Sequence, residues 1–558
     1  MQRGAPGGDE AAATPPTASA DPSRVLPGAM MTSIISAAPP SPGRQACPDQ
    51  PTGRPGGHQA SGDAAPGFPS TRRAQRTAPG ALLAVQGAGL GVPLVGGGWA
   101  EYANLDHAAS APCLTAVAEH VARVLPYSAS VHRGAGFASQ VCTTLYEGAR
   151  RDVARFVGAR DGDLTLFTRN TTDAVNLLAR CLPAAGGVGG VGGVVVFDVE
   201  HHANLLPWRA RAGYRSVAAR ATLAESLVAL EAELSAAPTA LLAVTGASNV
   251  TGETPPLARL ARMAHRAGAR IFVDAAQLAP HRRLDMAADG LDYLAFSGHK
   301  LYAPFGAGVL VGRADWLDAA PPYLAGGGAV REVSTDAVSW ATGPARHEAG
   351  TPNLAGATAI AAACRTLAAL PPHAWERHES GLRARLLGGL AGLDGVVIHR
   401  IWSDTDDGPN TDDGPDTDSA RETGGGRDTD DGAGAWRDAV GVVTFSLPGH
   451  DPARVSAYLS AEHGIGVRAG RFCAHPLLDR LGAPGGALRA SIGVGTTADH
   501  VDRLIAAVAR YLRGGAGWDY ALRDGQWQPT PDDRRLPAWA EEYAGAAAHD
   551  LPASPCGT

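Results

Sequence analysis

The residues with the clearest chemical potential follow two apolar segments that are predicted to be β-strands. Lys300 comes three residues after the run "LDYLAFS", and Asp274 closes the run "RIFVD". An apolar wall lowers the pKa of a lysine by desolvation, and a neutral amine can form a Schiff base with a carbonyl. Taken alone, each residue also has a simpler interpretation, Lys300 as a solvated surface residue and Asp274 as a strand-end cap.

A functional role is better supported for Lys300 and Asp274 together than for either alone. Only one strand–connection–strand unit separates them, so both can face one crevice. An aspartate near a pyridine nitrogen keeps that nitrogen protonated, which makes pyridoxal phosphate a strong electron sink. Thr171 and Thr172 precede a predicted helix in "TRNTTDAVNLLARCL". A helix N-terminus suits a phosphate group, although an ordinary threonine N-cap explains the pattern equally well.

The elements that must position these residues are short apolar runs separated by helical stretches. "DLTLFT", "GVVVFDVE" and "TALLAVTGAS" are typical strands, and "PPLARLARMAHRAG" is a typical helix. This alternation predicts an α/β fold with a mostly parallel sheet covered on both faces. In such sheets, ligands bind at the carboxyl ends of the strands.

The chain is expected to divide into two folded units with less regular segments around them. We predict a large domain over residues 96–365 and a smaller α+β domain over residues 366–513. Residues 1–95 are rich in Pro, Gly, Ala and Ser and predict a disordered extension. Residues 514–558 form an aromatic, proline-rich tail that packs on the body or docks a partner.

A low-complexity insert, residues 403–436, interrupts the smaller domain. It carries ten Asp and one Glu against two Arg, so its net charge of −9 exceeds the −7 of the whole chain. Its aspartate runs lack the closing Glu of a calcium loop. We therefore predict a solvated acidic loop.

Composition excludes several classes of protein. There is no Lys/Arg block, which argues against nucleic acid as a partner, and no apolar stretch long enough to span a membrane. The N-terminus lacks a secretory signal pattern. Seven scattered cysteines without a CxxC pair argue against a zinc ribbon or a disulfide framework and suit the cytoplasm. Cys473 and His475 offer only two ligands at a poor spacing, so no metal site is expected.

Several motifs, in a shared order, carry a family resemblance. The chain resembles the fold-type I pyridoxal-phosphate enzymes of aminotransferase class V, and within them the second group of cysteine desulfurases and selenocysteine lyases. The resemblance spans about residues 104–513 without the insert. It implies a large domain with a mostly parallel seven-stranded sheet, a smaller C-terminal α+β domain, and an N-terminal segment that contributes to the latter. The motifs are "NLDHAASAP", "SVHRGAG", "TRNTTDAVNLLA", "VEHHANLLPW", "GASNVTGETPPL", "FVDAAQ", "FSGHKLYAPFGAGVL", "EAGTPN", "RAGRFCAHPLL" and "LRASIGVGTT".

The resemblance also implies roles for residues around pyridoxal 5'-phosphate. Lys300 would carry the cofactor and shuttle the substrate Cα proton, and Asp274 would pair with the ring nitrogen. His201 would stack on the ring, with His202 as the alternative. Further cofactor contacts would come from Asn249, Gln277, Thr171, Thr172, Ser297 and His299.

Three more positions concern the substrate and the oligomer. Arg489 would grip the substrate carboxylate in a bidentate fork, unless it is a structural arginine. His132 would line the substrate entrance. Thr351 would reach the phosphate of the neighbouring subunit, which implies a homodimer.

Cys473 is the predicted nucleophile, and it follows Arg468 by the five residues seen in the family's second group. The implied reaction converts L-cysteine to L-alanine, with the sulfur held on Cys473 as a persulfide and passed to an acceptor protein. Arg468 and Arg471 flank the thiol and would favour its thiolate. The family often has His directly before this cysteine, where the chain has Arg471 and Phe472.

Other interpretations remain open. Cys473 could be an inert buried thiol. A selenocysteine lyase, aminotransferase or epimerase of the same class would not need this cysteine. A scaffold with a degenerate site is a third hypothesis, against which Lys300, Asp274 and Arg489 weigh.

We predict that deletion of residues 403–436 leaves folding intact, because an acidic low-complexity loop contributes little to a core. Circular dichroism and pyridoxal-phosphate binding of the deletion protein would check this. An insoluble or cofactor-free product would refute the loop assignment.

Overall fold

The computed structural model describes residues 77–183, 192–403 and 439–544. Most of the predicted extension and of the acidic insert, and the last residues of the tail, therefore lie outside the described residues. The extension was predicted too long, because residues 77–95 are structured. Strand β1 (Gly91–Pro93) pairs with β2 (Trp99–Glu101), and the backbone N–H groups of Leu82 and Leu83 donate to the carbonyl of Val494. These backbone bonds outweigh the glycine-rich composition of the segment.

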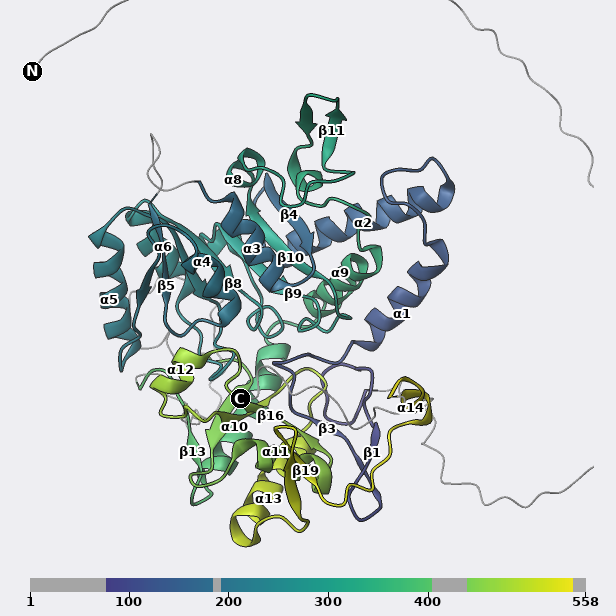
Figure 1. Cartoon of the computed structure of the whole chain (residues 1–558), viewed down its shortest axis with the longest axis vertical. Coiled ribbons are helices and arrows are strands. Elements are labelled where there is room, and N and C mark those ends of the chain that lie inside the picture. Colours follow the sequence, from purple (N-terminus) through teal and green to yellow (C-terminus); the bar gives the residue numbers. More distant parts are fainter. Residues whose placement is uncertain (1–76, 184–191, 404–438, 545–558) are drawn as a thin grey trace, which may run out of the picture. The chain divides into compact units, whose positions relative to one another are not determined.

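A seven-stranded sheet forms the centre of the larger body (Figure 1). Only β10 runs antiparallel to its neighbours, so the predicted α/β fold with a mostly parallel sheet is confirmed. In sheet order the strands are β4 (Asp163–Thr168), β10 (Gly308–Arg313), β9 (Tyr293–Ser297), β8 (Arg270–Asp274), β7 (Thr239–Thr245), β5 (Gly193–Phe197) and β6 (Arg215–Val217).

The sheet is buried on both faces because alternate residues of each strand enter different cores. On β5, Val195 belongs to a core that also contains residues of helices α5, α6 and α9, whereas Val194 and Val196 belong to a core with residues of α3, α4 and α8. Continuous apolar runs such as "GVVVF" follow from this double burial.

The helices of this body are α1 (Thr115–Val124), α2 (Phe137–Phe156), α3 (Thr171–Cys181), α4 (Leu206–Arg209), α5 (Leu223–Ala236), α6 (Leu257–Arg266), α7 (Met286–Asp289), α8 (Ala314–Ala319) and α9 (Leu354–Ala368). A hairpin of β11 (Val330–Val333) and β12 (Val338–Trp340) precedes α9.

A second core belongs to an antiparallel sheet of four strands with helices packed on it. The N-terminal segment joins this core, because Ala103 and Leu105 are buried in it and β3 (Ala103–Asn104) pairs in parallel with β15 (Ile465–Gly466). The four strands are β13 (Val397–Ile398), β14 (Val442–Ser446), β17 (Ala487–Ser491) and β16 (Arg468–Gly470), and the helices are α10 (Ala374–Ala391), α11 (Pro452–His463) and α13 (Ala498–Gly514). Helix α12 (His475–Arg480) follows β16, but its Leu477 and Leu478 are buried in the core of the larger body.

The described part of the C-terminal tail packs back on this second core. Its hairpin, β18 (Tyr520–Arg523) and β19 (Gln526–Pro529), contacts α11. Trp527 Nε1 donates to Asp451 at 2.8 Å, and the Tyr520 hydroxyl donates to Glu462 at 3.0 Å. A short helix, α14 (Ala538–Ala544), follows. No helix among the described residues is long and apolar enough to cross a membrane.

A buried carboxylate connects the two cores. Glu379 on α10 accepts hydrogen bonds from His281, from Arg282 at 2.9 Å and from the Gly441 N–H at 2.7 Å. His281 and Arg282 follow β8 in the large sheet, and Gly441 precedes β14. The Glu379 carboxylate therefore joins segments that carry both cores.

We predict that Glu379→Ala lowers the free energy of unfolding by about 3–5 kcal/mol, because it removes a buried carboxylate whose hydrogen bonds hold His281, Arg282 and the Gly441 N–H. Urea unfolding followed by circular dichroism would measure the loss. Glu231→Ala is the matched control. It breaks an exposed pair with Arg266, so a cost of at most about 1 kcal/mol is expected. Equal costs for the two variants would contradict the role of Glu379.

Candidate active site

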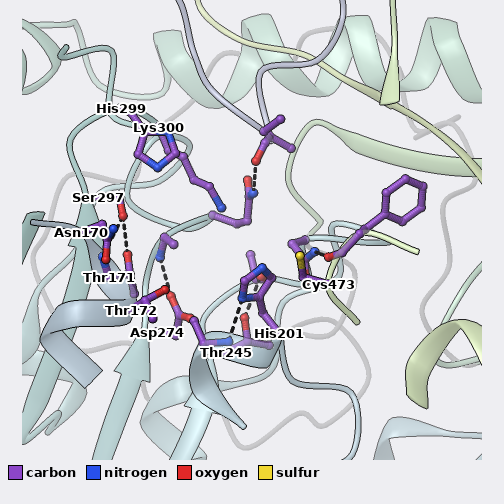
Figure 2. A pocket seen from close by; sticks show the side chains of 18 of the residues that line it. Asn170, Thr171, Thr172, His201, Thr245, Asp274, Ser297, His299, Lys300 and Cys473 are labelled. Carbon is purple, nitrogen blue, oxygen red and sulfur yellow. Dashed lines mark hydrogen bonds between the residues drawn. The ribbon is translucent and has the colours of Figure 1, made fainter. Parts of the chain in front are cut away.

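A cavity of about 370 Å³ lies at the carboxyl ends of β7, β8 and β9 (Figure 2). Thr245, Asp274 and Ser297 are the last residues of these three strands and line the cavity. Strands β16 and β17 of the second sheet supply the opposite wall. Eleven of the residues singled out in the sequence meet here, namely Thr171, Thr172, His201, Asn249, Asp274, Gln277, Ser297, His299, Lys300, Cys473 and Arg489.

Lys300 reaches this cavity from the turn that follows β9. The surrounding protein desolvates its amine and lowers its pKa to about 8, while the negative charge of Asp274 opposes this shift. A substantial fraction of the amine is therefore neutral near physiological pH and available as a nucleophile or a base.

Asp274 is buried at the end of β8. Its Oδ1 accepts the Ala276 N–H at 3.0 Å. Burial raises the pKa of its carboxyl group, and the charge of Lys300 works in the opposite direction. A cationic group entering the cavity beside Asp274 would stabilise the ionised carboxylate.

A polar cradle forms where α3 begins. Asn170 is the N-cap, and its side chain accepts the Asp173 N–H. The Thr171 N–H donates to Ser297 Oγ at 2.8 Å, and the two hydroxyl oxygens lie 2.7 Å apart. Thr172 lines the same end of the cavity. A helix N-terminus flanked by hydroxyl groups is a site suited to an anion.

The two adjacent histidines have different positions. His201 lines the cavity, and its Nδ1 accepts the Ala203 N–H at 3.0 Å. Burial, followed by the positive charge of Lys300, lowers its pKa to about 3, so the ring is neutral. His202 does not line the cavity; its backbone N–H donates to the carbonyl of Cys473 at 2.8 Å.

Arg489 lies on β17 and is only 3% exposed. One terminal nitrogen donates to the Asn249 carbonyl at 2.9 Å and the other to Asp106 Oδ1 at 3.1 Å. Nε has no hydrogen-bond partner among the described residues. Since each terminal nitrogen carries two N–H groups, the guanidinium keeps hydrogen-bonding capacity for a carboxylate ligand.

Cys473 lies in the turn between β16 and α12, is partly exposed and lines the cavity. Figure 2 shows its side chain on the same cavity as Lys300 and His201. Of the two flanking arginines, only Arg468 lines the cavity. Arg471 instead pairs with Asp479, and the expectation that both arginines favour the thiolate stays a prediction.

Two residues predicted for the site lie elsewhere in the single chain. His132 is paired with Glu147 at 3.0 Å on the surface, and Thr351 is exposed; neither lines the cavity. Asp106 was not assigned a place in the site from sequence. Asp106 stands in the motif "NLDHAASAP", and only its contact with Arg489 reveals its position. Among the described residues, no group of three or more His, Cys, Asp or Glu could hold a metal ion.

The sheet, the cavity at its strand ends and the Lys300–Asp274 pair define an α/β protein of the fold-type I class. The aminotransferase class-V model matches residues 103–407 and 435–504. The chain belongs to this family of pyridoxal-phosphate enzymes, in its cysteine desulfurase branch.

Individual relatives agree with this placement. The chain is 36% identical over 421 residues to a cysteine desulfurase of Dickeya dadantii, covering 74% of this chain and 92% of the relative. The chain is also similar to two solved structures, the cysteine desulfurase CsdA of Escherichia coli (32% identity, TM-score 0.60) and a cysteine desulfurase of Thermococcus onnurineus (31% identity, TM-score 0.62). Each match covers 74% of this chain and 95% of the other chain.

The pKa of Lys300 generates a pH prediction. Below pH 8 the amine is mostly protonated, so the rate at which the apo-protein captures pyridoxal phosphate should rise about tenfold per pH unit and level off above pH 8. Stopped-flow absorbance would record the profile. Asp274→Asn removes the charge that raises the pKa of Lys300, so the plateau should begin at lower pH. A wild-type rate that still rises at about pH 10 would contradict the lowered pKa.

Proposed function

We propose that the protein is a pyridoxal-phosphate-dependent cysteine desulfurase that converts L-cysteine to L-alanine and takes the sulfur onto Cys473. The observation that carries this proposal is that Cys473, Lys300 and Arg489 line one cavity. A thiol, a base of lowered pKa and a carboxylate receptor are what sulfur removal from an amino acid requires. The names of the relatives support the same activity.

The residues of the cavity fit pyridoxal phosphate. The hydroxyl groups at the start of α3 suit its phosphate, and Asp274 suits its ring nitrogen. Two buried atoms of lining residues, Gln277 Oε1 and His299 Nδ1, have no hydrogen-bond partner among the described residues, and a polar ligand would satisfy them. Neutral His201 offers an aromatic face without a competing charge.

When bound, pyridoxal phosphate would supply an electron sink that makes the substrate Cα–H acidic. Lys300 would hold the cofactor covalently and then, as the free amine, take and return the proton at Cα. Its lowered pKa suits this exchange, because a base works best when its pKa lies near the working pH.

Arg489 would orient the substrate by its carboxylate. The guanidinium plane is already fixed by Asn249 and Asp106, so little side-chain entropy remains to be lost on binding. Arginine suits this task because its fork of N–H groups matches a carboxylate.

Cys473 would act as the sulfur acceptor. Its thiolate attacks the substrate sulfur, an S–S bond forms as the substrate C–S bond breaks, and the bonding pair stays with the carbon fragment. That fragment is protonated and leaves as alanine, while Cys473 keeps a persulfide for an acceptor protein. The partial exposure of Cys473 allows such a delivery.

A homodimer forms part of the proposal. Thr351 is exposed, and so are Phe305 at 77% and Phe137 at 74%. Exposed apolar side chains of this size are typical of protein interfaces. In a homodimer Thr351 would serve the phosphate of the partner subunit. The cytoplasm remains the proposed location, since five cysteines of the described residues are free thiols.

The test is production of alanine and sulfide from L-cysteine. Cys473→Ala should keep the visible absorbance of bound cofactor and lose sulfide release by more than about 100-fold, because the nucleophile is gone. Lys300→Ala should lose both the absorbance and the activity.

Cys113→Ala is the matched control, since Cys113 is also a partly exposed free thiol but does not line the cavity. Its activity should equal that of the wild type. Full sulfide release by Cys473→Ala would reject the desulfurase mechanism. Turnover of another amino acid by that variant would then favour a different class-V reaction, that of a selenocysteine lyase, aminotransferase or epimerase.

A further inference from the structure

The turn that carries Cys473 has an unusual backbone. Phe472 and Cys473 have φ values of 52° and 53°. L-residues with a side chain rarely adopt this left-handed region, and two in succession are rarer, because Cβ crowds the following carbonyl. Other contacts must therefore hold the turn in place.

Two hydrogen bonds from the large sheet's connections hold the backbone of this turn. Asn249 Nδ2 donates to the Phe472 carbonyl at 2.8 Å, and the His202 N–H donates to the Cys473 carbonyl at 2.8 Å. Within the turn, the Ala474 N–H donates to the Arg471 carbonyl at 3.0 Å. Both left-handed residues thus have their carbonyl oxygens bound across the cavity.

The side chain of Phe472 adds a third contact. The guanidinium carbon of Arg489 lies 5.0 Å from the centre of the Phe472 ring, and both side chains are almost fully buried, at 6% and 3% exposure. A desolvated guanidinium over an aromatic face is attracted by the negative charge of that face. The edge of the guanidinium is directed to Asp106 and the Asn249 carbonyl.

We infer that Phe472 is a positioning residue that couples the carboxylate-binding Arg489 to the turn that carries Cys473. The inference rests on the proposed function and adds to it a role for the phenylalanine at position 472. Arg489 contacts the ring, and Asn249 contacts both Arg489 and the Phe472 carbonyl. The side chain that would receive the substrate carboxylate therefore packs on the residue before the nucleophile, and Asn249 binds both Arg489 and the turn.

The coupling gives Phe472 a role that a merely space-filling residue would not have. Removal of the ring should loosen the turn and weaken the placement of Arg489 together. In kinetic terms, the KM for L-cysteine should rise and kcat should fall, whereas a defect confined to the turn would change kcat alone.

The experiment measures the rate at which iodoacetamide alkylates Cys473 in the holoenzyme, read by peptide mass spectrometry. Buried Cys142, Cys181 and Cys364 serve as internal references for folding. Phe472→Leu keeps most of the volume but has no aromatic face, and Phe472→Gly also removes the backbone strain. Both should raise the alkylation rate about three- to thirtyfold, the range expected for loss of a cation–π contact between a partly exposed and a desolvated limit. Tyr543→Leu changes an exposed aromatic residue of α14 away from the cavity and should leave the rate unchanged.

A double-mutant cycle tests the coupling itself. Arg489→Met alone should also speed alkylation, and the combined Phe472→Leu/Arg489→Met protein should be no faster than the faster single variant, because both remove one contact. Multiplying effects, or an unchanged rate in Phe472→Leu and Phe472→Gly, would overturn the inference.

The readout separates this inference from the proposed function. If Cys473→Ala retains sulfide release, the desulfurase proposal fails. The alkylation rates still report whether Phe472 holds the turn.

Discussion

The parallel pairing of β8 with β9 is the interaction on which the site depends. Asp274 lies opposite Ala295 in this register, so Asp274 ends one strand while the next continues to Ser297 and delivers Lys300 three residues later. The backbone ladder therefore brings the acid and the amine to one edge of the sheet without any contribution from their own contacts. Burial of that edge by the second sheet then lowers the pKa of Lys300 and keeps Asp274 away from water.

The second sheet completes the cavity and does more than cover it. Arg489 and Arg468 come from its strands, and Cys473 comes from the turn that follows β16. The chemistry is thus divided between two sheets, since the amine follows β9 of the first and the thiol follows β16 of the second. Glu379, bound to His281 and Arg282 from the first body and to Gly441 from the second, links the segments that carry these groups.

Sequence reasoning identified the parallel sheet and most of the site because strand ends and local motifs are short-range signals. Asp274 and Ser297 end apolar runs that are buried on both faces, and Lys300 follows one of these runs. Such continuous apolar runs can be recognised from the sequence alone. The role of Asp106 could not be predicted because its partner Arg489 lies 383 residues away in the sequence. The left-handed φ of Phe472 could not be predicted either, because only tertiary contacts stabilise this conformation. Residues 77–95 looked disordered because their order comes from strand pairing and from Val494 rather than from their own composition.

The pairing of β3 with β15 has a consequence for biosynthesis. Ala103 and Leu105 are synthesised long before β14, β17 and α13, which begin at Val442, Ala487 and Ala498 and are needed for the core that buries the two residues. The large sheet, whose strands lie between Asp163 and Arg313, can form in the interval, since domains generally fold as units during synthesis. Until then Ala103 and Leu105 cannot be buried in this core. Contacts between segments so far apart in the sequence also slow folding. Strand β3 can therefore join its core only after the C-terminal strands have been synthesised.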